Sequence, residues 1–223
     1  MSRVIVEKTV SASLEALGLD FVDLVKNAKN IAIVSSGSTL ATQELIDAIR
    51  FHCRTPLFLL DPRAQAETIE ASIPRGDGVR MPIRRPKPVV DADVVIVLAS
   101  MIPDLRRRTE LSIEQYLFKT WLVLERSPSH FLHAHDPWLE GDLRDVILAD
   151  LYAQRPITLS IIDGAATSGI ALASFDAVAA DAVCIHMNGV IPEDVGYLRM
   201  LAQQGLGVCT LSKIDVPLGM ISR

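Results

Sequence analysis

Short apolar segments alternate with longer amphipathic segments along most of the 223-residue chain. The short segments are rich in Val, Ile and Leu, as buried β-strands are, and the longer segments repeat apolar residues at helical spacing. The predicted strands are Val4–Val10, Asn30–Val34, Leu57–Leu60, Asp93–Leu98, Trp121–Glu125, Ile157–Ile162 and Gly169–Ala173, with an edge strand at Val208–Leu211. The predicted helices are Ser13–Asn27, Leu40–Cys53, Ile113–Lys119, Leu143–Gln154, Asp176–Met187 and Pro192–Gln203.

This order of elements predicts an α/β fold with a mostly parallel sheet flanked by helices, because alternating strands and helices pack in that way. The segment from Asn30 to Leu60 forms one strand–helix–strand unit, which predicts a parallel pair of strands joined by a right-handed crossover. No internal repeat or low-complexity segment is evident. We therefore expect a single α/β domain over residues 1–223.

A segment rich in proline and arginine, at about residues 62–90, interrupts the alternation. It contains five of the twelve prolines, together with Arg80, Arg84, Arg85 and Lys87. Prolines favour turns and loops, so we predict a long excursion with little regular structure. Its basic residues, and those of Arg106–Arg108, are expected to face solvent or a neighbouring subunit, with binding of phosphate or an acidic partner as the alternative.

Composition and charge exclude several classes of protein. Hydrophobic residues make up 49% of the chain and the net charge is −5, whereas disordered chains combine low hydrophobicity with high net charge. The acidic balance argues against nucleic acid as a partner, since nucleic-acid binders carry basic surfaces. The apolar excess requires a large core, a subunit interface, or both. We therefore predict a homo-oligomer.

The mean hydropathy of +0.30 raises the question of a membrane span. A spanning helix needs about 20 mostly apolar residues. The most apolar stretch, Ile170–Met187, is interrupted by Asp176 and Asp181. Near the N-terminus, Glu7 and Lys8 stand where a signal peptide would have its apolar core. We expect a cytoplasmic protein with no membrane partner.

The three cysteines, Cys53, Cys184 and Cys209, are far apart in the sequence, and none has C-x-x-C spacing. An iron–sulfur cluster needs several cysteine ligands, so this chain alone cannot build one. We predict that each cysteine is a small buried hydrophobic side chain.

A run of small polar residues connects a predicted strand to the helix that follows it: Ser35, Ser36, Gly37, Ser38 and Thr39. Backbone N–H groups at a helix N-terminus, helped by hydroxyl groups, bind anions. The run lacks the glycine patterns of nucleotide-binding loops. It is predicted to contact an anion or small ligand, and capping of the helix by Ser38 or Thr39 is the alternative.

Aspartates mark further candidate positions. Asp61 and Asp163 fall at the carboxyl ends of predicted strands, where open α/β sheets bind their ligands. The loop after Asp163 can close over that site, and its ligand-binding candidates are Gly164, Thr167 and Ser168.

Two more aspartates belong to the predicted helix Asp176–Met187. Asp176 stands at its start and is expected to cap it. Asp181 lies in the Ala-rich part of the helix, where a buried carboxylate needs a partner.

Three histidines lie close together in one predicted loop, at His130, His133 and His135, and Asp136 follows them. Imidazole and carboxylate groups suit divalent transition metals such as zinc, iron or nickel. The histidines are therefore candidate metal ligands, and His130 and Asp163 are the best candidates for catalytic groups. A surface loop that binds no metal is the alternative.

The second half of the chain carries several motifs in a characteristic order. They are Asp91–Ile96, Leu143–Ile147, Arg155–Gly164, Ala173–Val183 and Gly189–Gly207. In this order they resemble the domain of unknown function 362 family of bacteria and archaea. The resemblance implies the α/β scaffold of that family but no particular reaction, because no general reaction is assigned to the family.

The chain departs from this family where its members carry lysines and histidines. Ser35–Gly37 stands in place of a Lys-Pro-Asn-like element, and Ala99–Asp104 contains neither lysine nor histidine. The ferredoxin-like iron–sulfur module of many members has no counterpart in these residues. No activity that depends on the missing lysines is expected.

These observations favour a small-ligand- or anion-binding domain without established catalysis, because scaffold motifs are kept while the lysine-bearing elements are lost. The alternative is a metal-dependent enzyme for a small acidic or phosphorylated metabolite, with His130, His133, His135 and Asp163 at its site. A further alternative is an accessory protein for metal or iron–sulfur cargo. The sequence contains neither the Gly-x-Ser-x-Gly motif of hydrolases nor the His-Glu-x-x-His motif of zinc proteases.

Overall fold

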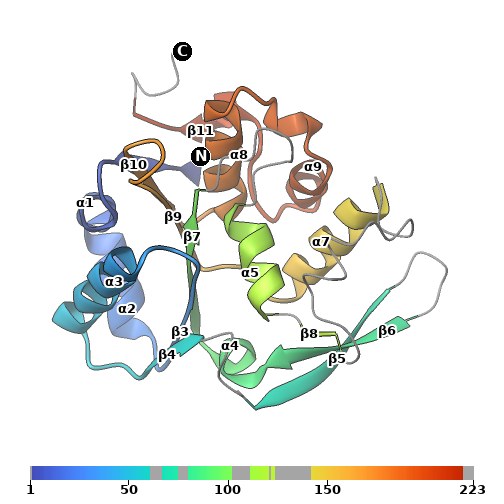
Figure 1. Cartoon of the computed structure of the whole chain (residues 1–223), viewed down its shortest axis with the longest axis horizontal. Coiled ribbons are helices and arrows are strands. Elements are labelled where there is room, and N and C mark those ends of the chain that lie inside the picture. The colour runs from blue at the N-terminus through green and yellow to red at the C-terminus, as the bar shows by residue number, and fades with distance from the viewer. Residues whose placement is uncertain are drawn as a thin grey trace.

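A six-stranded β-sheet forms the centre of the computed structural model (Figure 1). The structure describes residues 2–60, 67–74, 80–101, 111–120, 122–123 and 142–217. In spatial order, the strands of the sheet are β2 (Ile5–Glu7), β10 (Ile170–Ser174), β9 (Leu159–Gly164), β7 (Val94–Ser100), β3 (Ile31–Ser35) and β4 (Leu57–Leu60). Strands β4, β3, β7 and β9 pair in parallel, whereas β10 is antiparallel to both of its neighbours.

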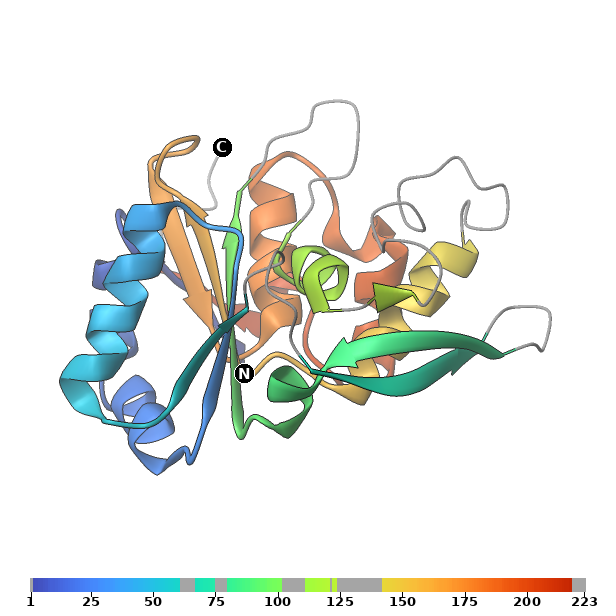
Figure 2. The same ribbon diagram turned by 60° about the horizontal axis from the view of Figure 1, so that its bottom comes forward.

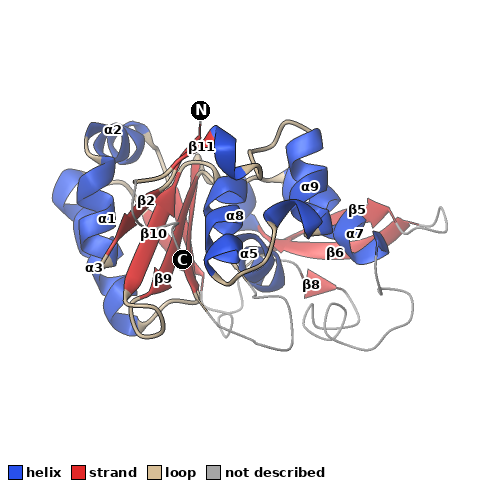
Figure 3. Cartoon of the chain, turned by 90° about the horizontal axis from the view of Figure 1, so that it is seen from above, coloured by secondary structure: helices blue, strands red, loops and turns tan. Residues whose placement is uncertain are grey.

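Helices cover both faces of this sheet (Figure 3). One face carries α1 (Val10–Leu17), α2 (Leu19–Asn27) and α3 (Thr39–His52). The other face carries α5 (Ser112–Thr120), α7 (Asp142–Gln154), α8 (Ala177–Met187) and α9 (Gly196–Gln203). The predicted α/β fold with a mostly parallel sheet flanked by helices is confirmed.

The strands separate two hydrophobic cores, because successive side chains of a strand point to opposite faces. In β3, Ile31 and Ile33 pack with α1, α2 and α3, whereas Ala32 and Val34 pack with the helices of the other face. The central strands are buried on both faces, which explains their continuous apolar runs.

The proline-rich excursion contains regular structure, so the prediction of little regular structure was wrong. Strands β5 (Thr68–Pro74) and β6 (Arg80–Pro86) pair as an antiparallel hairpin, and β8 (Leu122–Val123) adds a third strand (Figure 2). Two of its prolines stand at the ends of strands, and Pro82 lies just beyond the part of β6 that pairs with β8. At strand ends a missing N–H interrupts little of the sheet. The short helix α4 (Lys87–Asp91) follows the hairpin.

Arg85 also differs from the predicted solvent-facing position. It is buried beside Tyr116 of α5. Burial lowers the pKa of the Arg85 guanidinium, and burial raises the pKa of the Tyr116 hydroxyl to about 12.

Two other predicted elements differ in detail. The helix predicted at Ser13–Asn27 is divided into α1 and α2 by Gly18, whose φ of 61° a residue with a side chain rarely adopts. The edge strand predicted at Val208–Leu211 was wrong, since the Val208 N–H donates to Asp176 Oδ2 at 3.0 Å. A 3₁₀ turn at Leu211–Lys213 follows, and then β11 (Ile214–Asp215) pairs in parallel with β1 (Ser2–Arg3). Similarly, a 3₁₀ turn at Pro192–Asp194 precedes α9.

The cysteines agree with their prediction in two of three cases. Cys184 and Cys209 are buried, and burial raises the pKa of both thiols, whereas Cys53 is half-buried. Within the described residues, no helix is both long and apolar enough to cross a membrane. The homo-oligomer stays a prediction.

Candidate functional site

Three parallel strands end side by side at one edge of the sheet (Figure 2). Ser35, the last residue of β3, pairs in register with Leu98 of β7, and Ser100 at the end of β7 pairs with Asp163 of β9. The chain leaves β3 towards α3 on one face of the sheet, and the helix after β7 is α5 on the opposite face. Open α/β sheets bind ligands where consecutive connections diverge in this way. We call Ser35–Ser38, Ser100 and Asp163 the carboxyl edge.

The loop after β3 folds over the end of β7. The N–H groups of Ser36 and Gly37 donate to the carbonyl oxygen of Leu98, at 2.7 and 3.1 Å. A Cβ atom at Gly37 would lie 2.8 Å from Cγ of Leu98, so the close approach requires glycine. The Ser38 side chain accepts from the Ala41 N–H at 3.1 Å, which confirms helix capping by Ser38. Thr39 is the first residue of α3 and is exposed.

The Asp163 carboxylate lies at the N-terminus of α3. Its Oδ2 accepts from the Ser38 hydroxyl at 3.1 Å and from the Ser38 N–H at 3.4 Å, and its Oδ1 accepts from the Ala165 N–H at 3.2 Å. Negative charge is favourable at this end of a helix. The sequence predicted that Ser35–Thr39 contacts an anion. The Asp163 carboxylate occupies that position, so an anionic ligand would have to bind next to this carboxylate.

Helix α5 holds the carboxyl edge from the other face. Gln115 exchanges two hydrogen bonds with the backbone of Ser100: its Nε2 donates to the carbonyl oxygen at 2.7 Å, and the Ser100 N–H donates to its Oε1 at 3.0 Å. The Lys119 ammonium donates to the Ser35 carbonyl oxygen, and the Ser100 hydroxyl donates to that of Ser36. Sequence reasoning missed Ser100, Gln115 and Lys119. Ser100, the first polar residue at the end of an apolar strand, had a signal that could have identified it.

The turn between β9 and β10 lies beside the carboxyl edge. The Ser168 hydroxyl donates to the Gly164 carbonyl oxygen at 3.1 Å, and the Thr167 hydroxyl lies 3.2 Å from the same oxygen and 3.4 Å from that of Met101. A Cβ atom at Gly164 would lie 2.9 Å from the Ile170 carbonyl oxygen, so this turn is tightly closed. The structure therefore brings Gly164, Thr167 and Ser168 next to Asp163, with the two hydroxyls closing the turn.

Other candidate residues fall outside the described part of the chain. These are Asp61 and the histidines His130, His133 and His135. Among the residues that are described, no three His, Cys, Asp or Glu side chains are grouped to hold a metal ion. The metal site, and the catalytic role of His130, stay predictions.

Two open cavities lie at the opposite, amino-terminal edge of the sheet, and Phe175 lines both. One, of about 480 Å³, includes Asp20, Asp23 and Asp93; the other, of about 560 Å³, includes Asp176. Asp93 accepts from the N–H groups of residues 29 and 30. Asp176 caps α8, as predicted, and also accepts from the Ser2 hydroxyl and the Val208 N–H. Asp93 and Asp176 thus accept hydrogen bonds from the backbone around them, and the carboxyl edge is preferred as the candidate site because three parallel strands end there.

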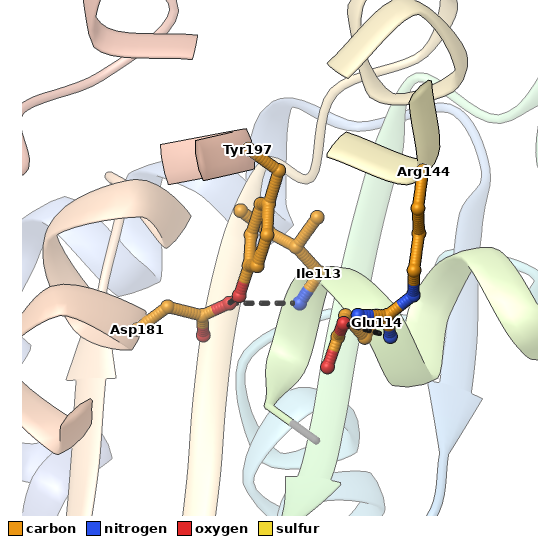
Figure 4. A network of polar contacts seen from close by, with 5 residues as sticks. All are labelled: Ile113, Glu114, Arg144, Asp181 and Tyr197. Atoms are coloured by element: carbon orange, nitrogen blue, oxygen red, sulfur yellow. Dashed lines mark hydrogen bonds and ion pairs between the residues drawn. The ribbon is translucent and has the colours of Figure 1, made fainter. Parts of the chain in front are cut away.

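A buried polar network joins α5 to α8 and α9 (Figure 4). Asp181 of α8 is fully buried, and its carboxylate accepts from the Ser112 hydroxyl at 2.6 Å and from the N–H groups of Ser112 and Ile113 at 3.0 and 3.1 Å. The Tyr197 hydroxyl lies 3.5 Å from the same carboxylate. The expectation that a buried Asp181 needs a partner is confirmed. Burial outweighs these donors and raises the pKa of Asp181 to about 7.

This pKa predicts that the protein loses stability as the pH rises from 6 to 8. The pKa in the folded state lies above the ordinary aspartate pKa of 3.8, so the stabilising contribution is complete below pH 4 and is lost as the pH rises through about 7. Linkage gives a decrease in the free energy of unfolding of about 1 kcal/mol between pH 6 and 8. Urea unfolding of the wild type and of Asp181→Asn measures it. We expect the variant to lack this decrease, and an unchanged pH dependence in the variant would contradict the assignment.

The sequence matches no protein-family model and no curated protein. Among solved structures, the lactate racemase apoprotein of Thermoanaerobacterium thermosaccharolyticum is similar, with a TM-score of 0.40 and 11% identity. The matched region covers 73% of this chain and 50% of that chain, so this chain spans about half the length of that protein. So distant a likeness implies nothing about activity, and the resemblance to the domain of unknown function 362 family stays a prediction.

Proposed function

We propose that the carboxyl edge binds a small molecule that presents hydrogen-bond donors, such as hydroxyl groups, to Asp163. The observation that carries the proposal is the position of Asp163, a half-buried carboxylate beside the point where the connections after β3 and β7 diverge. Three hydrogen bonds from Ser38 and Ala165 hold this carboxylate in place. A carboxylate can accept about four hydrogen bonds, so acceptor capacity is left for a ligand.

Charge favours a neutral ligand over an anion at this position. Two like charges about 4 Å apart near a protein surface repel each other by roughly 4 kcal/mol. The ammonium described at this edge, that of Lys119, already donates to the Ser35 carbonyl oxygen, so a phosphate or carboxylate group next to Asp163 would have to share this cation, whereas a hydroxylated neutral molecule needs none. The ligand class is accordingly narrowed from any small molecule or anion to a small hydroxyl-bearing molecule.

Substitution of Asp163 by Asn tests this proposal. We expect the neutral polyol sorbitol, titrated into ¹⁵N-labelled protein, to shift the amide signals of residues 36–38 and 163–165, and inorganic phosphate to shift them less. Asp163→Asn should weaken sorbitol binding about tenfold, because it removes a charged hydrogen-bond acceptor.

The matched control is Asp93→Asn at the amino-terminal edge of the sheet. Asp93 also accepts two backbone N–H groups, at 2.7 and 3.2 Å, but lies at the other end of β7. This variant should bind sorbitol as the wild type does. Equal binding by Asp163→Asn and the wild type, or shifts only at the amino-terminal edge, would disprove the proposed site.

A further inference from the structure

Helix α5 connects a buried carboxylate to the carboxyl edge. Its first residues, Ser112 and Ile113, donate their N–H groups to Asp181, which lies 69 and 68 residues away in the sequence. Figure 4 shows Asp181 reaching from α8 towards Ile113 at the start of α5. One turn further along α5, Gln115 holds the backbone of Ser100, and one turn beyond Gln115, Lys119 holds the carbonyl group of Ser35.

A carboxylate at this place satisfies a requirement of α5. The first N–H groups of a helix have no hydrogen-bond acceptor within the helix. Where the start of the helix is buried in the protein, another part of the chain must supply these acceptors. Ser112, Ile113 and Asp181 are all inaccessible to solvent, so water cannot supply it. Asp181 provides both oxygens of its carboxylate, and its charge also suits the positive end of the helix.

We propose that Asp181 is a positioning residue for the carboxyl edge: by holding the first turn of α5, it sets the places of Gln115 and Lys119. Its importance for binding rests on the function proposed above. Gln115 is itself buried, and its two hydrogen bonds to Ser100 fix where the side chain lies. A shift of the first turn of α5 therefore reaches the ends of β7 and β3 through these contacts.

Amide hydrogen exchange, resolved by NMR, tests this inference without any ligand. In Asp181→Asn, the amide group has one acceptor oxygen instead of two, and it turns an NH₂ group towards a backbone donor. We expect the N–H groups of Ser112 and Ile113 to exchange about tenfold faster than in the wild type. Exchange of the Ser100 N–H should also be faster, by at least about threefold. If this variant does not fold, Ser112→Ala removes only the 2.6 Å hydroxyl contact and should give the same pattern at smaller amplitude.

Two control variants separate positioning from general loss of stability. Gln115→Ala should accelerate exchange at Ser100 and leave exchange at Ser112 and Ile113 unchanged, because it removes only the hydrogen bonds between Gln115 and the Ser100 backbone. Leu45→Ala destabilises the opposite core. In Leu45→Ala, the Ser100 N–H should not exchange faster relative to the N–H of Val25, a buried residue of α2 that serves as the reference.

The pH profile gives a readout that a purely structural role would not produce. The groups facing Asp181 are Tyr197 of α9, Tyr152 of α7 and Cys184 of α8, and burial raises the pKa of each one, so they stay neutral at pH 6–8. The remaining charged groups near Tyr197 are Asp145 and the Glu114–Arg144 pair. In the wild type, exchange at Ser100 relative to Val25 should become faster as the pH falls from 8 to 6, because protonation weakens one acceptor oxygen. The ratio should be constant in Asp181→Asn.

Exchange at Ser100 that is unchanged in Asp181→Asn, or accelerated equally in Leu45→Ala, would overturn the inference. A ratio in the wild type that does not change with pH would overturn it as well. These results do not depend on sorbitol binding. If sorbitol fails to bind while the exchange pattern appears, the proposed function is wrong and the positioning role of Asp181 stands.

Discussion

Leu45→Ala is expected to lower the free energy of unfolding by about 2–5 kcal/mol, because truncating a buried leucine removes its packing and leaves a cavity. Leu45 lies on the inner face of α3, is completely buried and packs in the core shared with α1 and α2. A protein of this size loses about 2–4 °C in melting temperature per kcal/mol, so the shift is readily measured by calorimetry or urea unfolding.

The same helix offers a matched control. Leu40 lies five residues before Leu45, but its exposed fraction is 70%. Leu40→Ala changes the same number of atoms with little burial, so we expect a change within about 0.5 kcal/mol. Equal losses in the two variants would mean that α3 does not pack on the sheet through the face that contains Leu45.

Arg144→Met should destabilise the protein by about 3 kcal/mol, because it leaves the charge of Glu114 in the interior without its ion-pair partner. The two side chains join α7 to α5 with an N–O distance of 2.6 Å (Figure 4). The Glu114 side chain is only 1% exposed and that of Arg144 is 20% exposed, so water screens the pair weakly. Urea unfolding at pH 7 measures the loss.

A double-mutant cycle separates this interaction from packing. Glu114→Gln combined with Arg144→Met should recover much of the loss, since neither position of the pair then carries a charge. Lys87→Met is the exposed comparison, because Lys87 and Glu67 pair at 3.1 Å with side chains that are 43% and 73% exposed. Its effect should stay below about 1 kcal/mol. Losses that simply add in the double variant would show that Glu114 and Arg144 contribute independently.

The buried strands were predictable because their signal is local. Strands β3 and β7 begin and end within one or two residues of the predicted ranges, and β4 matches its range. A strand that is covered on both faces must be apolar at every position, whatever its neighbours are. The β5–β6 hairpin was missed because proline is a strong local signal for loops, whereas the pairing that tolerates it depends on which strand lies opposite.

Part of the candidate site was predictable for a similar reason. Ser38 and Asp163 each follow an apolar strand, and the carboxyl ends of parallel strands meet at one edge of the sheet. Their direct contact, across 125 residues of sequence, was not predictable. Nor was the bearing of this contact on the proposed ligand class predictable, since a run of serines before a helix suggests an anion until a carboxylate of the protein is found beside it.

The sequence by itself determined the buried strands of the central sheet, most of the helices and the α/β class, because periodicity and capping act over a few neighbouring residues. Only the tertiary structure decided which polar side chains meet. Ser112 lies 69 residues from Asp181, and Lys119 lies 84 residues from Ser35. Such partners are set by how the helices pack on the two faces of the sheet. In that interior, each buried donor or acceptor must find a partner or lose the hydrogen bonds it made with water.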